Sequence, residues 1–139
     1  MKKIFCLAFA AMLCCGFVAC SDDDDVNNSN LTSEEKLLVG TWTFEKGYEY
    51  GYGYYYAEDE GIEEQWVFNS NGSGRVKGRY YDGPDYGWVS ESWNFKWDIV
   101  GSMLIVRDDE GDMLESRIEE LSQHELVISD DEARYYYVR

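Results

Sequence analysis

The chain has no cysteine after Cys20, although it has four cysteines in all. Residues 21–139 therefore cannot form an internal disulfide, and side-chain packing alone must hold their core. The single histidine, His124, lies in a predicted short turn. Without a cysteine nucleophile or a set of cysteine and histidine ligands, the sequence excludes the familiar catalytic triads and zinc sites. We therefore expect no enzyme activity, no metal site and no cofactor.

Basic residues are also scarce. The chain has 12 Lys and Arg residues against 28 Asp and Glu residues, which gives a formal net charge of −16 at pH 7. A chain of this charge repels the phosphate backbones of nucleic acids. We expect no nucleic-acid partner.

Long apolar runs are absent except for Ile4–Ala19, which is too short to span a membrane comfortably. This run follows Met1, Lys2 and Lys3 and ends at Cys20, the order of regions typical of a secretory signal peptide. Phe17-Val18-Ala19-Cys20 resembles the lipobox of bacterial lipoproteins, in which cleavage before the cysteine leaves it as the lipid-bearing first residue. The resemblance implies a signal peptide at residues 1–19 and lipidation of Cys20. The alternative is an ordinary signal peptide in which the cysteines are only small apolar residues.

A run of acidic residues directly follows Cys20 and comprises Ser21, Asp22, Asp23, Asp24 and Asp25. It resembles the export signal that Bacteroidetes-type bacteria place behind the lipidated cysteine of surface-exposed lipoproteins; the alternative is a solvated acidic linker. Residues 20–30 show no apolar periodicity, which predicts a flexible tether. A lipobox cysteine carries more than one acyl chain, enough for stable anchoring. Together the resemblances imply a protein held in the outer membrane by its lipid and exposed on the cell surface.

Residues 31–139 have the pattern of one all-β domain after a short helix. Thr32 and Glu35 have the spacing of a capping box, and an apolar segment follows before Gly40. From Gly40 onward apolar and polar residues alternate, and turn signals recur at short intervals. The strands we predict are 41–48, 63–69, 74–81, 91–99, 103–107, 113–120, 125–129 and 134–138. Eight antiparallel strands in sequence predict an up-and-down barrel.

The start of this domain carries a family resemblance. A short helix followed by Gly40-Thr41-Trp42 at the opening of the first of eight strands resembles the Gly-x-Trp start of lipocalins. Residues 31–139 as a whole resemble the lipocalin-like domain of small bacterial lipoproteins. The resemblance implies a lipocalin-like barrel in which an arginine, Arg139 or Arg134, packs over Trp42.

Alternate connections of a meander lie at opposite ends of the barrel. Residues 49–62, 82–90, 108–112 and 130–133 share the end away from the helix, which by resemblance is the lipocalin mouth with 49–62 as its lid loop. The aromatic residues of these connections are candidates for ligand binding: Tyr50, Tyr52, Tyr54, Tyr56, Tyr86 and Trp88. Tyrosines recur in period two and in phase with Trp42 and Phe44 at Tyr48, Tyr50, Tyr52, Tyr54 and Tyr56. Gly51 and Gly53 must bend the chain there. The tyrosines either form a stacking platform for a ligand or pack on each other in a rim or projecting hairpin.

The sequence therefore predicts a cell-surface lipoprotein whose barrel binds a small amphipathic or hydroxylated ligand at an aromatic mouth. Two alternatives remain open. One is a surface module that binds proteins or glycans while its barrel is filled, because four tryptophans compete for the interior. The other is a structural lipoprotein of the envelope.

Overall fold

The computed structural model describes residues 30–139, so the predicted signal peptide, Cys20 and the acidic run at Ser21–Asp25 lie outside the described residues. The elements are α1 (Ser33–Leu38), β1 (Gly40–Glu49), β2 (Gly53–Tyr56), α2 (Ala57–Glu60), β3 (Ile62–Phe68), β4 (Ser73–Tyr81), β5 (Trp88–Val100), β6 (Met103–Asp108), β7 (Met113–Leu121), β8 (Glu125–Ser129) and β9 (Ala133–Val138). In this part of the chain, neither helix is long and apolar enough to cross a membrane.

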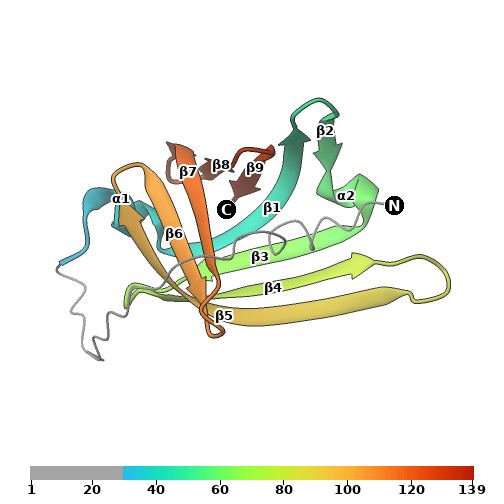
Figure 1. Ribbon diagram of the computed structural model, residues 1–139, viewed down its shortest axis with the longest axis horizontal. Coiled ribbons are helices and arrows are strands. Elements are labelled where there is room, and N and C mark those ends of the chain that lie inside the picture. Colours follow the sequence, from blue (N-terminus) through green and yellow to red (C-terminus); the bar gives the residue numbers. More distant parts are fainter. Residues whose placement is uncertain (1–29) are drawn as a thin grey trace.

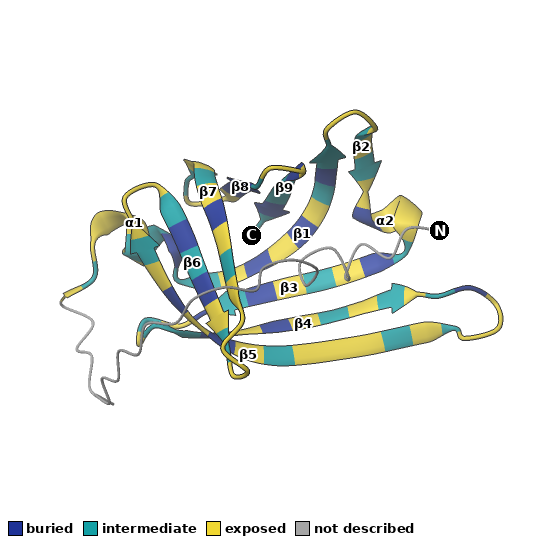
Figure 2. Cartoon of the chain, viewed as in Figure 1, coloured by how far each residue is buried: buried dark blue, intermediate teal, exposed yellow. Residues whose placement is uncertain are grey.

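The strands form one antiparallel sheet that closes on itself (Figure 1). Each strand from β3 to β8 pairs with the next along the chain, and β1 pairs with both β3 and β9. This confirms the all-β, eight-stranded up-and-down barrel with a short N-terminal helix, and all eight predicted strands are present. The largest shift is in β5, which begins at Trp88 and not at residue 91. Figure 2 shows buried and exposed bands alternating along the strands, as expected when one face of each strand lies in the core and the other in solvent.

The segment predicted as a lid loop is folded differently. Residues Gly40–Thr43 of β1 pair with β3, whereas Lys46–Glu49 pair with β2, which takes the place that β3 would otherwise occupy. The short helix α2 then leads into β3. Segment 49–62 is therefore a hairpin strand and a helical turn beside the barrel wall, and Figure 1 shows this hairpin rising away from β3, β4 and β5.

A bulge in β1 changes which residues face the core. The register with β9 shifts between Phe44 and Lys46, so Glu45 is an extra residue of β1 that has no cross-strand partner on β9. Trp42 and Phe44 are buried before the bulge, but Gly47 is the buried residue after it and Tyr48 faces outward. The predicted common phase of the tyrosines with Trp42 and Phe44 is therefore wrong. The predicted bends are confirmed, because Gly51 and Gly53 have φ of +89° and +101°.

The helix α1 closes one end of the barrel. Its capping box between Thr32 and Glu35 is formed, and Leu38 at its end is fully buried. Trp42 Nε1 donates to the Leu38 carbonyl at 2.8 Å, and the Arg139 guanidinium lies 4.3 Å from the Trp42 ring centre. Of the two candidate arginines, Arg139 is the one that packs over this tryptophan. A Cβ on Gly40 would lie 2.7 Å from Arg139 Nη1, so the glycine leaves room for the arginine.

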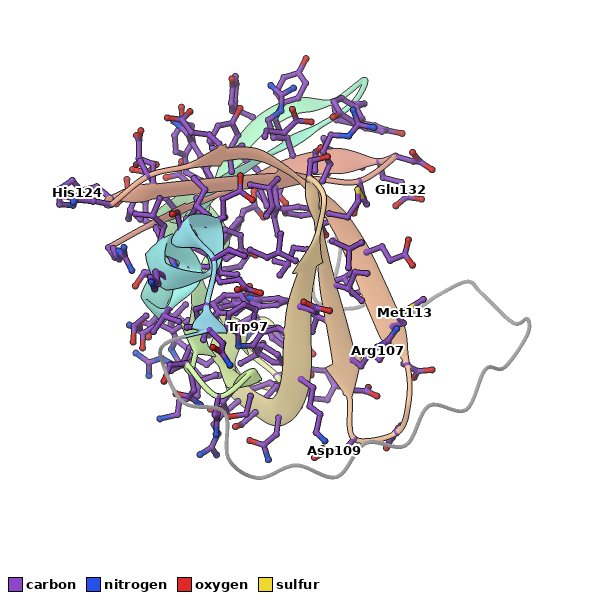
Figure 3. The ribbon with its side chains drawn as sticks, turned by 90° about the vertical axis from the view of Figure 1, so that its left-hand side faces the viewer. Trp97, Arg107, Asp109, Met113, His124 and Glu132 are labelled. Atoms are coloured by element: carbon purple, nitrogen blue, oxygen red, sulfur yellow. The ribbon has the colours of Figure 1, made fainter. Side chains whose placement is uncertain are left out.

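The predicted sorting of loops between the two ends is supported at β8 and β9. His124 and Glu132 lie at opposite ends of this hairpin (Figure 3). At one end Arg139 N donates to the His124 carbonyl at 3.2 Å, close to α1. At the other end Tyr50 N donates to the Glu132 carbonyl at 3.0 Å, so the β1–β2 turn and the β8–β9 loop are neighbours. We call this second end the open end.

Candidate functional site

On the N-terminal side of Phe95, where the pairing of β5 with β6 stops, β3, β4 and β5 extend past the closed barrel. The inward face at this open end carries side chains that are only half-buried. They are Tyr55, Tyr80, Val89, Trp93, Leu114 and Tyr135. Their inward direction follows from strand alternation with buried residues such as Val76, Phe95 and Val106. Most are aromatic or large aliphatic residues whose surfaces the fold leaves partly uncovered. This end of the interior therefore offers an apolar, aromatic surface.

Tyr55 reaches this surface because of a glycine on the neighbouring strand. Gly47 is the cross-strand partner of Tyr55, and a Cβ on Gly47 would lie 2.1 Å from the tyrosine ring. The ring lies against the bare backbone, with its centroid 6.1 Å from that of Phe44. Burial, with the nearby charge of Glu49 second, raises the pKa of Tyr55 to about 12. Its hydroxyl is therefore neutral at physiological pH and able to donate a hydrogen bond.

One carboxylate lies among these aromatic residues. Glu64 shares the inward side of β3 with Ile62 and Trp66. Its Oε1 accepts a hydrogen bond from Tyr137 OH at 3.2 Å and another from Trp66 Nε1. Burial raises the pKa of Glu64, the two hydrogen bonds act in the opposite direction, and the charge of Glu91 adds to the rise. Burial first, and then the charge of Glu64, holds the pKa of Tyr137 well above its ordinary value.

The sheet register places a second carboxylate in the same row. Glu64 pairs with Gly78 of β4, and Gly78 pairs with Glu91 of β5. Glu91 is exposed, and its alternation with Trp93 and Phe95 directs it to the inside of the wall. The next row toward α1 holds Trp66 and Trp93, whose ring centroids are 5.7 Å apart. The open end thus combines a row of two tryptophans with a neighbouring row in which Gly78 separates Glu64 from Glu91.

The candidate residues from the sequence lie elsewhere. All six of Tyr50, Tyr52, Tyr54, Tyr56, Tyr86 and Trp88 are exposed. On the outer side of the β1–β2 hairpin, Tyr48 contacts Tyr50 and Tyr54 with ring centroids 6.0 and 4.8 Å away, and Tyr136 lies 6.2 Å from Tyr54. We call Tyr48, Tyr50, Tyr54 and Tyr136 the tyrosine cluster. Lys46 lies over its edge, 5.1 Å from the Tyr136 ring centre.

Trp88 belongs to a different part of the outer surface. Its ring lies 5.8 Å from that of Tyr81 and 4.6 Å from the Arg79 guanidinium. Arg79 also donates to Glu63 through Nε and Nη2, at 2.6 and 2.7 Å. The structure therefore does not bring Trp88 together with the tyrosine cluster.

A concavity of about 890 Å³ lies beside this ion pair, at β3, β4 and β5 next to α2. Arg75, Lys77 and Arg79 line it together with hydroxyl groups of Ser90 and Ser92. Glu64, Gly78 and Glu91 line it as well, so the concavity also borders the row that holds the two acids. Within residues 30–139, no group of three or more His, Cys, Asp or Glu side chains is arranged to hold a metal ion.

The interior residues Glu64, Glu91, Trp93 and Tyr137 are not among the ligand-binding residues predicted from the sequence. A signal for Glu64 was nevertheless present, because it has the phase of Trp66 and Phe68 on an otherwise apolar strand face. When an acidic residue faces inward from a barrel strand, its carboxyl group must either be buried with hydrogen-bond partners or be available to a ligand.

Comparisons with known proteins agree with this architecture. The family model of the lipocalin-like domain matches residues 38–128. A lipocalin-like protein from Bacteroides uniformis ATCC 8492 has a similar solved structure, with a TM-score of 0.56 and 12% identity over 74% of this chain and 98% of that one. An uncharacterized protein from Bacteroides eggerthii DSM 20697 gives 0.53 and 11% over 73% and 98%. The sequence matches no functionally curated protein. Because the family match spans more than half of the sequence, the chain belongs to the lipocalin-like domain family.

Proposed function

We propose that this protein is a surface lipoprotein whose barrel binds a small amphipathic ligand at the open end. The observation that carries the proposal is the set of inward-facing aromatic residues that the fold leaves half-buried there. Apolar surface gains about 25 cal/mol for each Å² removed from water, so a ligand that covers Tyr55, Trp93 and Leu114 gains affinity from them. Membership of a lipocalin-like family supports the same role.

The ligand we propose has an apolar body and a polar group. Small-ligand sites combine a mainly apolar lining with a few placed polar groups that fix orientation. Here the lining contains Trp93 and Leu114, and the polar groups are the Tyr55 hydroxyl and the Glu64 carboxylate. A purely apolar ligand would leave these polar groups without a new partner.

The proposed location rests on residues outside the described part of the chain. The lipobox-like run before Cys20 and the acidic residues after it support lipid anchoring in the outer membrane and exposure at the cell surface. The membrane is then a partner through the lipid anchor.

The tyrosine cluster favours a second candidate function. Exposed aromatic residues gathered on one surface commonly mark an interaction site. Tyr52, at 77% exposure, and Tyr54, at 55%, project from the β1–β2 hairpin on the outside of the barrel. Their rings suit stacking on a glycan or packing on a partner protein. In this alternative the barrel serves as the support for the hairpin.

One fluorescence experiment separates the two functions. The neutral probe N-phenyl-1-naphthylamine gains fluorescence when it enters an apolar site, and we expect this gain with the purified protein. Leu114→Trp adds a ring inside the open end and should abolish the gain. Met113→Trp adds the same ring on the outer side of β7, where Met113 is exposed, and should leave the gain unchanged.

The outer residues give the converse measurement. Replacement of Tyr52, Tyr54 and Tyr56 by Ser should leave probe binding intact if the barrel interior is the site. Loss of probe binding in this triple variant, with full binding by Leu114→Trp, would instead assign binding to the hairpin. Thermal melts of every variant establish that the barrel remains folded.

A further inference from the structure

Within the open end, we infer that the ligand carries an ammonium group, which binds between Glu64 and Glu91 above Gly78. This inference rests on the proposed function, which supplies the ligand. What it adds is that the polar group of the ligand is positively charged. It concerns a primary or secondary amine attached to an aromatic or aliphatic body.

The sheet register supplies the geometry. Glu64, Gly78 and Glu91 form one inward row across β3, β4 and β5. Neighbouring strands are about 4.8 Å apart, so the outer two residues of the row have Cα atoms roughly 10 Å apart. Gly78 has no side chain to fill the space between them. An ammonium group has three donors, and two carboxylates that approach from opposite sides can both accept from it.

The aromatic row beneath the acids favours a cation. Trp66 and Trp93 lie one inward row closer to α1, and their rings meet edge to face. Tryptophan is the side chain that attracts a cation over its face most strongly. Trp66 is buried, so Trp93, which is half-buried, is the ring of the pair with surface left for a cation. Because Trp66 Nε1 donates to Glu64, the indole and the carboxylate are fixed relative to each other. The site is therefore organised before a ligand arrives.

Among residues 30–139, neither Glu64 nor Glu91 forms an ion pair with a basic side chain. The basic residues of β4 and β5 alternate to the outer face, where they are exposed: Arg75, Lys77, Arg79 and Lys96. The ion pairs seen among residues 30–139 join Lys46 with Glu45 and Arg79 with Glu63. A carboxylate placed in an apolar interior is unfavourable unless it is paired. A cationic ligand would provide the charge that Glu64 lacks.

Three probes of matched shape test the charge of the ligand. They are 4-phenylbutylamine, 4-phenylbutan-1-ol and 5-phenylpentanoate, which end in an ammonium, a hydroxyl and a carboxylate. Isothermal titration of the purified protein should show the amine binding about 10-fold or more tightly than the alcohol, since hydrogen bonds to charged groups are the stronger ones. The carboxylate should bind least.

Two variants locate the preference. Glu64→Gln should reduce amine affinity to that of the alcohol and leave alcohol affinity unchanged, and Glu91→Gln should reduce the amine preference in part. Asp98→Asn removes the same charge from the outer face of β5 and should leave the preference intact. This control separates the local carboxylates from the negative charge of the whole protein.

The outcomes distinguish this inference from the proposed function. Equal affinity for the amine and the alcohol, or an amine preference that survives Glu64→Gln, overturns the ammonium site while the neutral naphthylamine probe still reports a ligand-binding barrel. If the neutral probe and all three phenyl compounds fail to bind, both the proposed function and this inference are wrong.

Discussion

The Arg139 guanidinium lies over the ring of Trp42, with its carbon 4.3 Å from the ring centre. It therefore joins the residue that follows the last strand to the first strand of the barrel. Its Nη1 donates to the Val39 carbonyl at 2.8 Å and its Nε to the Gln123 carbonyl at 2.6 Å. The arginine therefore ties α1, β1 and the β7–β8 turn together at the end that α1 closes.

Removal of this contact should destabilise the fold. Arg139→Ala loses a cation–π contact and leaves two carbonyls without their donor, so we expect a loss of about 1–3 kcal/mol in the free energy of unfolding. Urea denaturation measures the loss. Arg107→Ala, on the exposed outer face of β6, is the control and should change stability by less than about 0.5 kcal/mol. Equal effects of the two substitutions would contradict a structural role for Arg139.

The raised pKa of Glu64 predicts how stability depends on pH. A carboxyl whose pKa is higher in the folded state than its ordinary value of 4.5 binds its proton more tightly when folded. Its contribution to stability is therefore greatest below pH of about 4.5 and falls as the pH rises through the raised folded-state pKa. The groups that face it, Glu91, Tyr137 and Tyr55, act through a negative charge and through hydroxyls that stay neutral in this range.

Glu64→Gln should consequently raise the thermal midpoint near pH 7–8, and the gain should vanish toward pH 4. Thermal melts of both proteins across this range give the comparison. A variant that is less stable than the parent at every pH would mean that the hydrogen bonds from Tyr137 and Trp66 outweigh the burial of the charge. In that case Glu64 would be a structural residue.

The close approach of Tyr55 to Gly47 predicts a steric conflict. Gly47→Ala places a methyl group 2.1 Å from the ring and must displace Tyr55 or the β2 strand, at an expected loss of about 2 kcal/mol or more. Tyr55→Ala in the same chain makes room for the methyl group. The double variant should therefore lose less stability than the two single losses added together, and simple additivity would show that the ring does not rest on residue 47.

The lipid anchor is tested at Cys20. Cys20→Ala removes the residue that the lipobox resemblance assigns to lipidation, so the protein should move from the membrane fraction to the soluble fraction of disrupted cells. A Cys15→Ala variant, which keeps Cys20, should remain membrane-bound. Equal membrane association of the Cys20 variant and the parent would refute lipidation at this residue.

The acidic run is tested separately from the anchor. Conversion of Asp22, Asp23, Asp24 and Asp25 to a mixture of Asn and Ala should lower cleavage by protease added to intact cells, while membrane attachment persists. The expected reason is loss of the export signal, with the lipid untouched. Unchanged surface cleavage would identify the run as a spacer only.

The regular part of the fold could be predicted from the sequence because alternation and turn residues determine it locally. Trp93, Phe95, Trp97 and Ile99 mark β5 by themselves, and the capping box marks α1. The bulge at Glu45 could not be predicted, because one extra residue in a strand changes the phase without changing the composition. That shift turned Tyr48 and its neighbours outward and Tyr55 inward.

The candidate site was harder to predict for a related reason. Glu64 and Glu91 lie 27 positions apart, and only the pairing of both with Gly78 places them in one row. The hydrogen bond from Tyr137 to Glu64 joins residues 73 positions apart and depends on closure of the barrel. Sequence patterns indicate the phase of each strand, whereas the register between strands comes from packing of the whole sheet.

Because β1 pairs first with β3 and then with β2, the barrel wall is interrupted between β1 and β3 beyond Thr43. Ladder bonds join β1 to β3 only from Gly40 to Thr43, and beyond this point β1 continues with β2 while Ile62, Glu63 and Glu64 continue with β4. The helix α2 packs against both β1 and β3 here and contributes the buried Ala57 to the core. A barrel closed over its full height has an aperture fixed by strand number and stagger. Here β5 also extends beyond its pairing with β6, so the row of Glu64, Gly78 and Glu91 lies on a part of the sheet whose β3 and β5 edges have no further ladder partner within residues 30–139.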